Sequence, residues 1–369
     1  MAEFCMPSLG ADMEAGRLVE WRVKPGDRVQ AGDIIAVVET QKGAIDVEIF
    51  QSGVVESFLV EPGREVPVGT PLARILGEGE AATAVPAAPA PTPAATVPPP
   101  ARSRVSPVAR RRAVELGVDL AALSGSGEEG AITLADVERA AAPAASQDRA
   151  GAMRRAIAAA MSRAKREIPH YYLSATFSVE PALAWLEAEN ARRPLPERIL
   201  PAVLLLKATA LALRAAPELN GTYAGDGFRH SDDIHLGVAV FLRSGGLVAP
   251  ALRNADRSDL SALMHELRDL VARARSGGLR ASELSAPTMT VTSLGEQGVE
   301  VVLPVIIPPQ VAIVGFGSIV ERPWVEAGAV VARRVVTASL AADHRASDGH
   351  CGALFLQAIG RLLQEPEKL

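Results

Sequence analysis

The chain has 369 residues, more than a single hydrophobic core ordinarily holds, so two or three domains are expected. Hydrophobic residues make up 48% of the chain and charged residues 22%, and the net charge is −5 at pH 7. This acidic balance argues against nucleic acid or an anionic membrane surface as the main partner.

The N-terminal segment and the longest apolar run argue against secretion and membrane insertion. Residues 1–14 include acidic residues and show neither a basic segment nor an apolar core typical of a signal peptide. The apolar run at 201–216 is interrupted by two basic residues and is too short to span a bilayer, so it predicts a buried helix. Cys5 and Cys351 follow no metal-ligand or redox spacing. We therefore expect a cytoplasmic protein with reduced thiols and no metal site.

Two segments rich in Ala and Pro divide the chain. Residues 78–104 predict an extended, semi-rigid linker that reaches roughly 80 Å at about 3.1 Å per residue. A shorter segment of the same character covers residues 141–150. Three predicted domains remain, at residues 1–77, 105–140 and 151–369.

The first domain contains an internal repeat. A strand–turn–strand unit with a Pro-Gly turn occurs twice, 37 residues apart. The repeated positions are Gly16, Leu18, Trp21, Val23, Pro25, Gly26, Val29 and Gly32, which recur as Gly53, Val55, Phe58, Val60, Pro62, Gly63, Val66 and Gly69. Alternating apolar residues around both turns predict a small β-sandwich with approximate two-fold symmetry.

Lys42 lies between the two copies, at the tip of a predicted hairpin. A lysine in such a turn is usually only a solvated side chain. The whole of residues 1–77, however, resembles a lipoyl domain, in which the lysine of an ETDKA-like turn carries lipoate. The resemblance implies covalent lipoate on Lys42, although Gln41 and Gly43 replace the usual Asp and Ala. A biotin carrier has a related fold, but its modified lysine lies between two methionines, so the residues before Lys42 favour lipoate.

The second domain, residues 105–140, predicts two short helices around a glycine-rich loop, with Thr133 as the N-cap of the second helix. It resembles the peripheral-subunit-binding domain of the 2-oxo acid dehydrogenase complexes. That domain docks a thiamine-dependent 2-oxo acid decarboxylase or dihydrolipoamide dehydrogenase through arginines, a role that falls here on Arg110 and Arg111. Ala131 stands where the family has a loop arginine, which leaves the partner open, and the alternative is a solvated arginine face.

The third domain, residues 151–369, predicts an α/β fold with a mixed sheet. An amphipathic helix from Met153 ends near Pro169, and further apolar helices at 201–216 and 260–274 alternate with strand-like runs. The predicted strands cover residues 235–242, 288–294, 311–316 and 334–341, and a last helix covers 350–363.

His344 follows the last predicted strand directly and precedes the last helix. Most histidines at such positions are structural. Transfer of an acyl group between two thiols needs a base, because a thiol with a pKa of about 8.5 is mostly protonated at pH 7. It also needs a hydrogen-bond donor for the developing oxyanion. No metal cluster or nucleophile elbow is recognisable, so the sequence does not indicate a covalent acyl-enzyme.

The segment Asp343-His344-Arg345-Ala346-Ser347-Asp348-Gly349 resembles the DHRxxDG motif in the catalytic domain of the 2-oxo acid dehydrogenase acyltransferases, which chloramphenicol acetyltransferase shares in looser form. The resemblance implies that His344 is the general base and that Asp348 forms structural ion pairs. In the TxTSLG-like run before Gly295 the matching oxyanion donor is Thr292. Ala160, Ile307 and residues 241–244 depart from the family pattern, at positions that affect coenzyme A contacts or acyl preference.

The order of carrier, binding module and transferase predicts the acyltransferase core subunit of such a complex, which moves an acyl group from dihydrolipoyl-lysine to coenzyme A. The resemblance favours acetyl, as in pyruvate dehydrogenase, over succinyl, branched-chain and acetoin-derived groups. It also implies trimers with active sites between subunits, assembled into a cage of 24 or 60 subunits. The alternatives are a non-catalytic tethering subunit, which usually loses the catalytic histidine, and a free-standing small-molecule acetyltransferase, which leaves the carrier domain unexplained.

Overall fold

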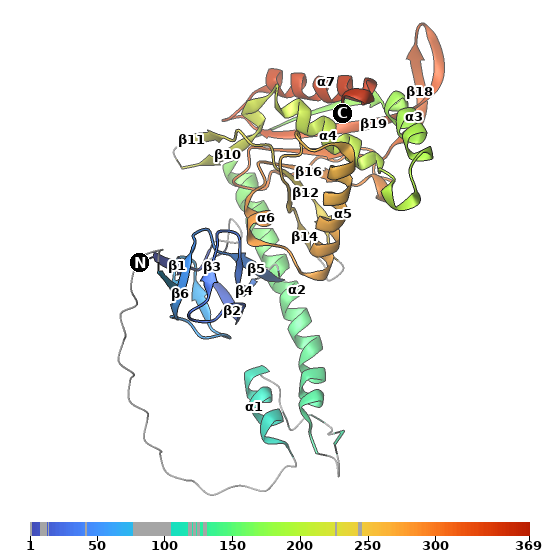
Figure 1. The fold of residues 1–369 in the computed structure, drawn as a ribbon. Coiled ribbons are helices and arrows are strands. Elements are labelled where there is room, and N and C mark those ends of the chain that lie inside the picture. The colour runs from blue at the N-terminus through green and yellow to red at the C-terminus, as the bar shows by residue number, and fades with distance from the viewer. Residues whose placement is uncertain are drawn as a thin grey trace, which may run out of the picture. The chain divides into compact units, whose positions relative to one another are not determined.

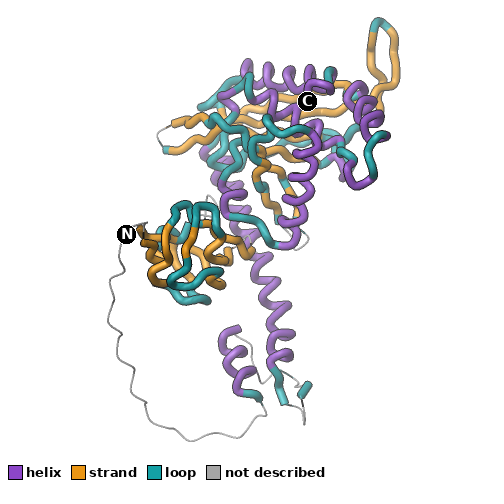
Figure 2. Tube along the Cα trace, in the orientation of Figure 1, coloured by secondary structure: helices purple, strands orange, loops and turns teal. Residues whose placement is uncertain are grey.

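The computed structural model describes residues 2–7, 13, 15–40, 43–76, 105–116, 120, 123, 126–127, 131–225, 227–242 and 246–369 (Figures 1 and 2). The chain divides into two compact units, Met1–Gly79 with Arg155–Leu369 and Glu80–Arg154. Lys42 and the predicted linker at 78–104 lie outside the described residues. The predictions made for them stay predictions.

The N-terminal domain is the β-sandwich that the sequence predicts. Its two antiparallel four-stranded sheets have the orders β1-β8-β6-β3 and β5-β4-β2-β7. The strands are β1 (Ala2–Cys5), β2 (Ala15–Trp21), β3 (Arg28–Val29), β4 (Ile34–Thr40), β5 (Gly43–Glu48), β6 (Gly53–Phe58), β7 (Glu65–Pro67) and β8 (Pro71–Leu76). Corresponding strands of the two copies, such as β2 and β6, lie in opposite sheets, as an approximate two-fold axis requires.

Residues at equivalent positions of the repeat also have equivalent structural roles. Trp21 and Phe58 stack on each other with ring centroids 4.2 Å apart. Gly26 and Gly63 have φ values of 95° and 92°, a conformation that residues with a Cβ rarely adopt. The Pro-Gly turn therefore recurs because both copies reverse direction through the same left-handed residue.

The second unit contains the two helices that the sequence predicts for the small domain. They are α1 (Pro107–Leu116) and the N-terminal turns of α2 (Leu134–Glu167). Their small core consists of Ala109, Ala113, Ile132 and Val137. Thr133 caps α2 as predicted, because its hydroxyl accepts the N–H of Asp136 at 3.3 Å while the Asp136 carboxylate accepts the N–H of Thr133 at 3.0 Å.

Residues 141–150 differ from the extended linker that the sequence suggests, because they lie within α2. Alanine has the highest helix propensity of all residues, so an alanine-rich segment flanked by helix formers continues the helix despite Pro143. The predicted end of this helix near Pro169 agrees with the observed end at Glu167.

The large domain is built on a mixed seven-stranded sheet, which confirms the predicted fold class. Its order is β15-β12-β16-β17-β19-β18, with β9 paired to β19. The pairs β12–β16 and β16–β17 are parallel, whereas β19 is antiparallel to all of its neighbours. The strands are β9 (His170–Ser178), β12 (Leu236–Val238), β15 (Ala251–Leu252), β16 (Met289–Ser293), β17 (Ala312–Phe316), β18 (Val320–Glu326) and β19 (Ala329–Asp343).

Two small sheets and several helices complete the large domain. The small sheets pair β10 (Gly221–Ala224) with β11 (Gly227–His230) and β13 (Val240–Phe241) with β14 (Leu247–Val248). The helices are α3 (Glu180–Ala191), α4 (Pro201–Leu213), α5 (Leu260–Ser276), α6 (Ala281–Ser285) and α7 (Gly349–Gln364), with the short 3-10 helices η3 (Leu195–Glu197), η4 (Pro217–Leu219), η5 (Gly295–Gln297) and η6 (Pro366–Lys368).

The helix α7 fixes one end of the loop that carries His344. It packs against β9 and against α4, the apolar helix predicted from the sequence and buried along most of its length (Figure 1). The short loop between β19 and α7 is therefore held at a fixed end of the sheet. Among the described helices, none combines the length and apolar character that a membrane crossing requires.

Candidate active site

Asp343 anchors the loop that carries His344. It is the last residue of β19 and is fully buried. Its carboxylate accepts hydrogen bonds from the Arg345 guanidinium, the shorter at 2.7 Å, and the guanidinium also lies 4.0 Å over the ring of Tyr223. The pairing with Asp343 raises the pKa of Arg345, so the buried carboxylate always has a cationic partner.

His344 is exposed at the end of β19, as predicted. Its backbone N–H donates to the carbonyl oxygen of Pro169 at 3.0 Å, which ties the loop to the residue before β9. Its imidazole meets the ring of Tyr171 edge to face, with ring centroids 5.2 Å apart. The backbone of His344, the candidate base, is therefore fixed. Its imidazole contacts one aromatic ring, that of Tyr171, and the side chain remains exposed to solvent.

Asp348 has a different immediate role from the structural ion pairs that the resemblance implies. Within one chain its carboxylate caps α7, accepting the N–H groups of His350 at 3.0 Å and Cys351 at 2.9 Å. The hydrogen bond from Cys351 contributes most to lowering the pKa of Asp348. The capped helix begins directly after the His344 loop, so Asp348 fixes the loop's far end.

Cys351, on the first turn of α7, is unsuited to act as a nucleophile. Burial and the neighbouring Glu218 carboxylate raise the pKa of its thiol to about 11. The thiolate, which is the reactive form, is therefore scarce near neutral pH. This agrees with the absence of any sequence signal for a covalent acyl-enzyme.

Thr292 lies on β16, partly buried, but the structure does not bring it to His344 within one chain. Thr292 pairs with Gly315 of β17, which pairs with Ser339 of β19, and His344 follows Ser339 by five residues. At about 3.3 Å per residue this offset is about 16 Å along the strands, in addition to two inter-strand spacings. The two side chains cannot reach each other across that distance.

The hairpin with Lys42 is described only through its flanking strands. β4 and β5 pair in an antiparallel manner up to Thr40 and Gly43, which are opposite each other. Lys42 itself lies outside the described residues.

Arg110 and Arg111 are both exposed on α1, and Ala131 is partly buried in the loop before α2.

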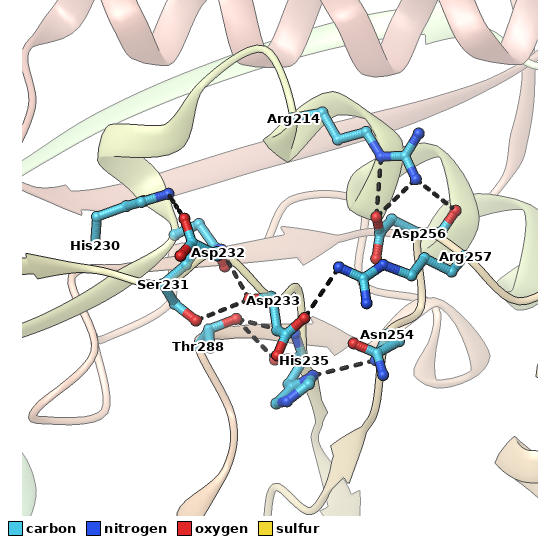
Figure 3. A network of polar contacts seen from close by, with 11 residues as sticks. Arg214, His230, Ser231, Asp232, Asp233, His235, Asn254, Asp256, Arg257 and Thr288 are labelled. Carbon is cyan, nitrogen blue, oxygen red and sulfur yellow. Dashed lines mark hydrogen bonds and ion pairs between the residues drawn. The ribbon is translucent and has the colours of Figure 1, made fainter.

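A separate polar network surrounds a cavity of about 370 Å³ near the C-terminal end of α4 (Figure 3). Arg214 donates to Asp256 at 2.8 and 2.9 Å, and Arg257 pairs with Asp233 at 3.1 Å. The buried Lys207 donates to the carbonyl oxygens of Asp256 and Ser258 at 2.8 and 2.6 Å. These contacts hold the loop between β15 and α5 against α4, a structural role that the sequence does not reveal.

Sequence reasoning also missed Tyr171 and Ser347 as neighbours of the base. The Tyr171 hydroxyl shares a 2.9 Å hydrogen bond with the Ser347 hydroxyl. Both residues occur in segments that resemble the family, but only their closeness in space relates them to His344. Among the described residues, no group of three or more His, Cys, Asp or Glu side chains is arranged to hold a metal ion.

Comparison with protein-family models supports all three predicted domains. The model of the 2-oxoacid dehydrogenases acyltransferase catalytic domain matches residues 143–369. A model described as biotin-requiring enzyme matches residues 2–75, and the e3 binding domain matches residues 103–138.

Individual proteins show the same relationship. The dihydrolipoyllysine-residue acetyltransferase component of the pyruvate dehydrogenase complex of Zymomonas mobilis is 32% identical in an alignment that covers 99% of this chain and 98% of that protein. The structure of the cubic core of the pyruvate dehydrogenase multienzyme complex gives a TM-score of 0.56 at 28% identity, covering 58% of this chain and 90% of that chain. The dihydrolipoamide acetyltransferase of Azotobacter vinelandii gives the same values.

An α/β acyltransferase domain with a histidine at a strand end, joined to a lipoyl-type sandwich and a two-helix binding domain, defines a class of multidomain acyltransferases. The chain belongs to the family of 2-oxo acid dehydrogenase acyltransferases.

Proposed function

We propose that the protein transfers acetyl groups from S-acetyl-dihydrolipoyl-lysine to coenzyme A in a pyruvate dehydrogenase complex, using His344 as the base. The observation that carries the proposal is the fixed position of His344, between the Pro169 carbonyl and the Tyr171 ring, at the end of β19. The exposed His344 side chain also leaves the imidazole accessible to a thiol.

In the proposed mechanism, His344 accepts the proton of the coenzyme A thiol and later returns it to the departing thiol of the dihydrolipoyl group. The Thr292 hydroxyl donates a hydrogen bond to the oxyanion that develops on the thioester carbonyl. Asp348 does not touch the reacting atoms and instead fixes the loop by capping α7. Lys42 carries the lipoyl group on the N-terminal sandwich.

The spacing of the three residues supports this assignment. The study of the A. vinelandii enzyme addresses the catalytic role of a serine, a histidine 52 residues after it and an asparagine four residues after the histidine. Thr292, His344 and Asp348 have the same two spacings here. Threonine keeps the hydroxyl of serine, and aspartate keeps a side-chain oxygen that can cap a helix.

The separation of Thr292 and His344 within one chain supports an active site between two copies. If both act on one substrate, the His344 of one subunit must meet the Thr292 of another. Such a head-to-tail contact forms a ring when its rotation closes, as it does in the trimers that the family resemblance implies. We propose that these trimers build a cubic core like that of the related complex.

Mixed assemblies test the shared site and the catalytic roles together. His344→Ala and Thr292→Ala subunits, each nearly inactive alone, should regain activity when they are co-expressed. Random mixing in a ring of three restores at most about a quarter of the sites, because each intact site needs one subunit of each kind in the right order. The measurement is acetyl transfer from acetyl-coenzyme A to free dihydrolipoamide, the reverse of the proposed reaction.

Thr292→Ser co-expressed with His344→Ala is the matched control, because a hydroxyl is retained. No recovery from the two alanine variants in isolated mixed trimers would place both groups in one subunit. A fully active Thr292→Ala variant would remove Thr292 from the mechanism. High activity in His344→Ala alone would favour a non-catalytic tethering subunit.

Partner docking is assigned to Arg110 and Arg111 on α1, because both guanidinium groups are exposed. The N-terminal domain has a net negative charge, since residues 1–77 contain 12 Asp and Glu against 7 Lys and Arg, so it is a poor source of positive charge for docking. The proposed partners are the thiamine-dependent decarboxylase and dihydrolipoamide dehydrogenase. The cytoplasmic location predicted from the sequence remains part of this proposal.

Arg110→Ala should weaken binding of the partner enzyme roughly tenfold or more at low salt, because a charge-assisted hydrogen bond is lost. The difference should shrink as salt screens the interaction. Calorimetric titration measures both effects. Arg192→Ala, which removes an exposed charge from the large domain, is the control and should bind like the wild type. If the Arg110→Ala and Arg192→Ala variants bind the partner enzyme with equal affinity, the docking surface does not include Arg110.

A further inference from the structure

We propose that Tyr171 is a positioning residue for His344, through its ring and through its hydrogen bond to Ser347. The inference rests on the proposed function, because it takes His344 as the base. Three independent observations carry it: the contact between the two rings, the hydroxyl pair, and the space left by Gly352.

The Tyr171 ring is enclosed by several elements of the fold. Tyr171 is the second residue of β9 and pairs with Ala342 on β19. On the α7 side, a Cβ at Gly352 would lie 3.1 Å from Cε2 of the tyrosine, so glycine leaves the room that the ring fills. The hydroxyl is held at 2.9 Å by Ser347, within the loop that carries His344. The Tyr171 ring contacts the His344 imidazole on a side that these neighbours leave free.

The contact with His344 has the geometry of a favourable aromatic pair. The ring centroids are 5.2 Å apart and the planes meet at 66°, within the range of edge-to-face contacts. The backbone of His344 is fixed by Pro169, the residue two positions before Tyr171. Backbone and side chain of the base are thus both held by the beginning of β9, which limits the rotamers of the imidazole.

The tyrosine hydroxyl stays neutral in this role. Burial raises the pKa of Tyr171 to about 12, so the phenol keeps its proton throughout the physiological range. It therefore remains a hydrogen-bonding partner of Ser347 and adds no charge beside the base. The loop residue Ser347 is also tied to β19, since its N–H donates to the carbonyl oxygen of Asp343 at 3.1 Å.

Kinetics of single variants give the first test. Tyr171→Leu removes the ring and the hydroxyl and should lower kcat about 10- to 100-fold, with the KM values for acetyl-coenzyme A and dihydrolipoamide nearly unchanged. Tyr171→Phe keeps the ring and should lose only about 2- to 10-fold. Ser347→Ala should match Tyr171→Phe, and the two changes combined should cost no more than either alone.

Tyr172→Phe is the matched control. Tyr172 is the next residue of β9, on the opposite face, where it stacks on His170 with ring centroids 5.8 Å apart. Its activity should stay at the wild-type level. Thermal unfolding of each variant shows whether the assembly remains intact, and Tyr171→Phe, which keeps the partly buried ring, serves if the leucine variant does not fold.

The decisive measurement repeats Tyr171→Leu in the His344→Ala background. If Tyr171 acts through the base, the second change has no further effect on the residual rate. An equal loss in both backgrounds, an unchanged kcat in a folded Tyr171→Leu variant, or a rise in KM alone would overturn the inference. An active His344→Ala variant would instead overturn the proposed function, so the two failures are distinguishable.

Discussion

His344→Ala should lower kcat for acetyl transfer between dihydrolipoamide and coenzyme A by about 10²–10⁴-fold, because the proposed base is removed. Tyr171 and Cys351 are not expected to replace it, because burial raises their pKa values to about 12 and about 11 and both groups therefore stay protonated. Assembly should be unaffected, because the backbone hydrogen bond of His344 to Pro169 does not depend on the side chain.

The control for this variant is His265→Ala, which removes an exposed imidazole from α5. It should leave both kcat and the oligomeric state unchanged. Steady-state kinetics and light scattering on the same samples separate a chemical defect from an assembly defect. A fully assembled His344→Ala protein with a near-normal rate would exclude the base mechanism, and the transferase activity would then belong to a partner chain.

Lys42→Arg should abolish lipoylation and reduce the overall reaction of the reconstituted complex to background. Arginine keeps the positive charge at the turn but cannot form the amide that holds lipoate. Acetyl transfer to free dihydrolipoamide should remain at the wild-type rate, because the variant leaves β19 and the His344 loop unaltered. Intact mass of the full chain, after co-expression with a lipoate ligase, should lack one lipoyl group.

Lys24→Arg provides the comparison, since Lys24 and Lys42 are the two lysines of residues 1–77. Lys24 lies in a Pro-Gly turn, where its backbone N–H donates to the Asp27 carboxylate at 2.7 Å. The Lys24→Arg chain should accept lipoate normally. A lipoyl group found on Lys24, or biotin found on either lysine, would contradict the assignment of the carrier residue.

The repeat, the domain order and the carrier turn could be predicted from the sequence because their determinants are local. Pro-Gly turns specify left-handed residues in both copies, and the alternating apolar residues between them specify a two-layer sandwich. The apolar run from Pro201 likewise becomes the buried helix α4. In each case neighbouring residues supply the physical reason, so no knowledge of distant contacts is needed.

The segment 141–150 shows where composition alone was insufficient. Proline and alanine together are compatible with an extended linker or with a helix, and composition alone does not decide between them. The position of this segment between two helix-forming stretches favours the continuous helix α2.

The surroundings of His344 were decided by the tertiary structure. Pro169, Tyr171 and Gly352 belong to separate segments of the sequence, and only the pairing of β9 with β19 and the packing of α7 on β9 bring them to one place. The register of β16, β17 and β19 similarly separates Thr292 from His344 within one chain. The sequence by itself indicated the order of the domains and the candidate reactive groups, because motifs and turns are short-range features. Their mutual geometry depends on strand register and helix packing between residues far apart in the chain, which only the folded structure specifies.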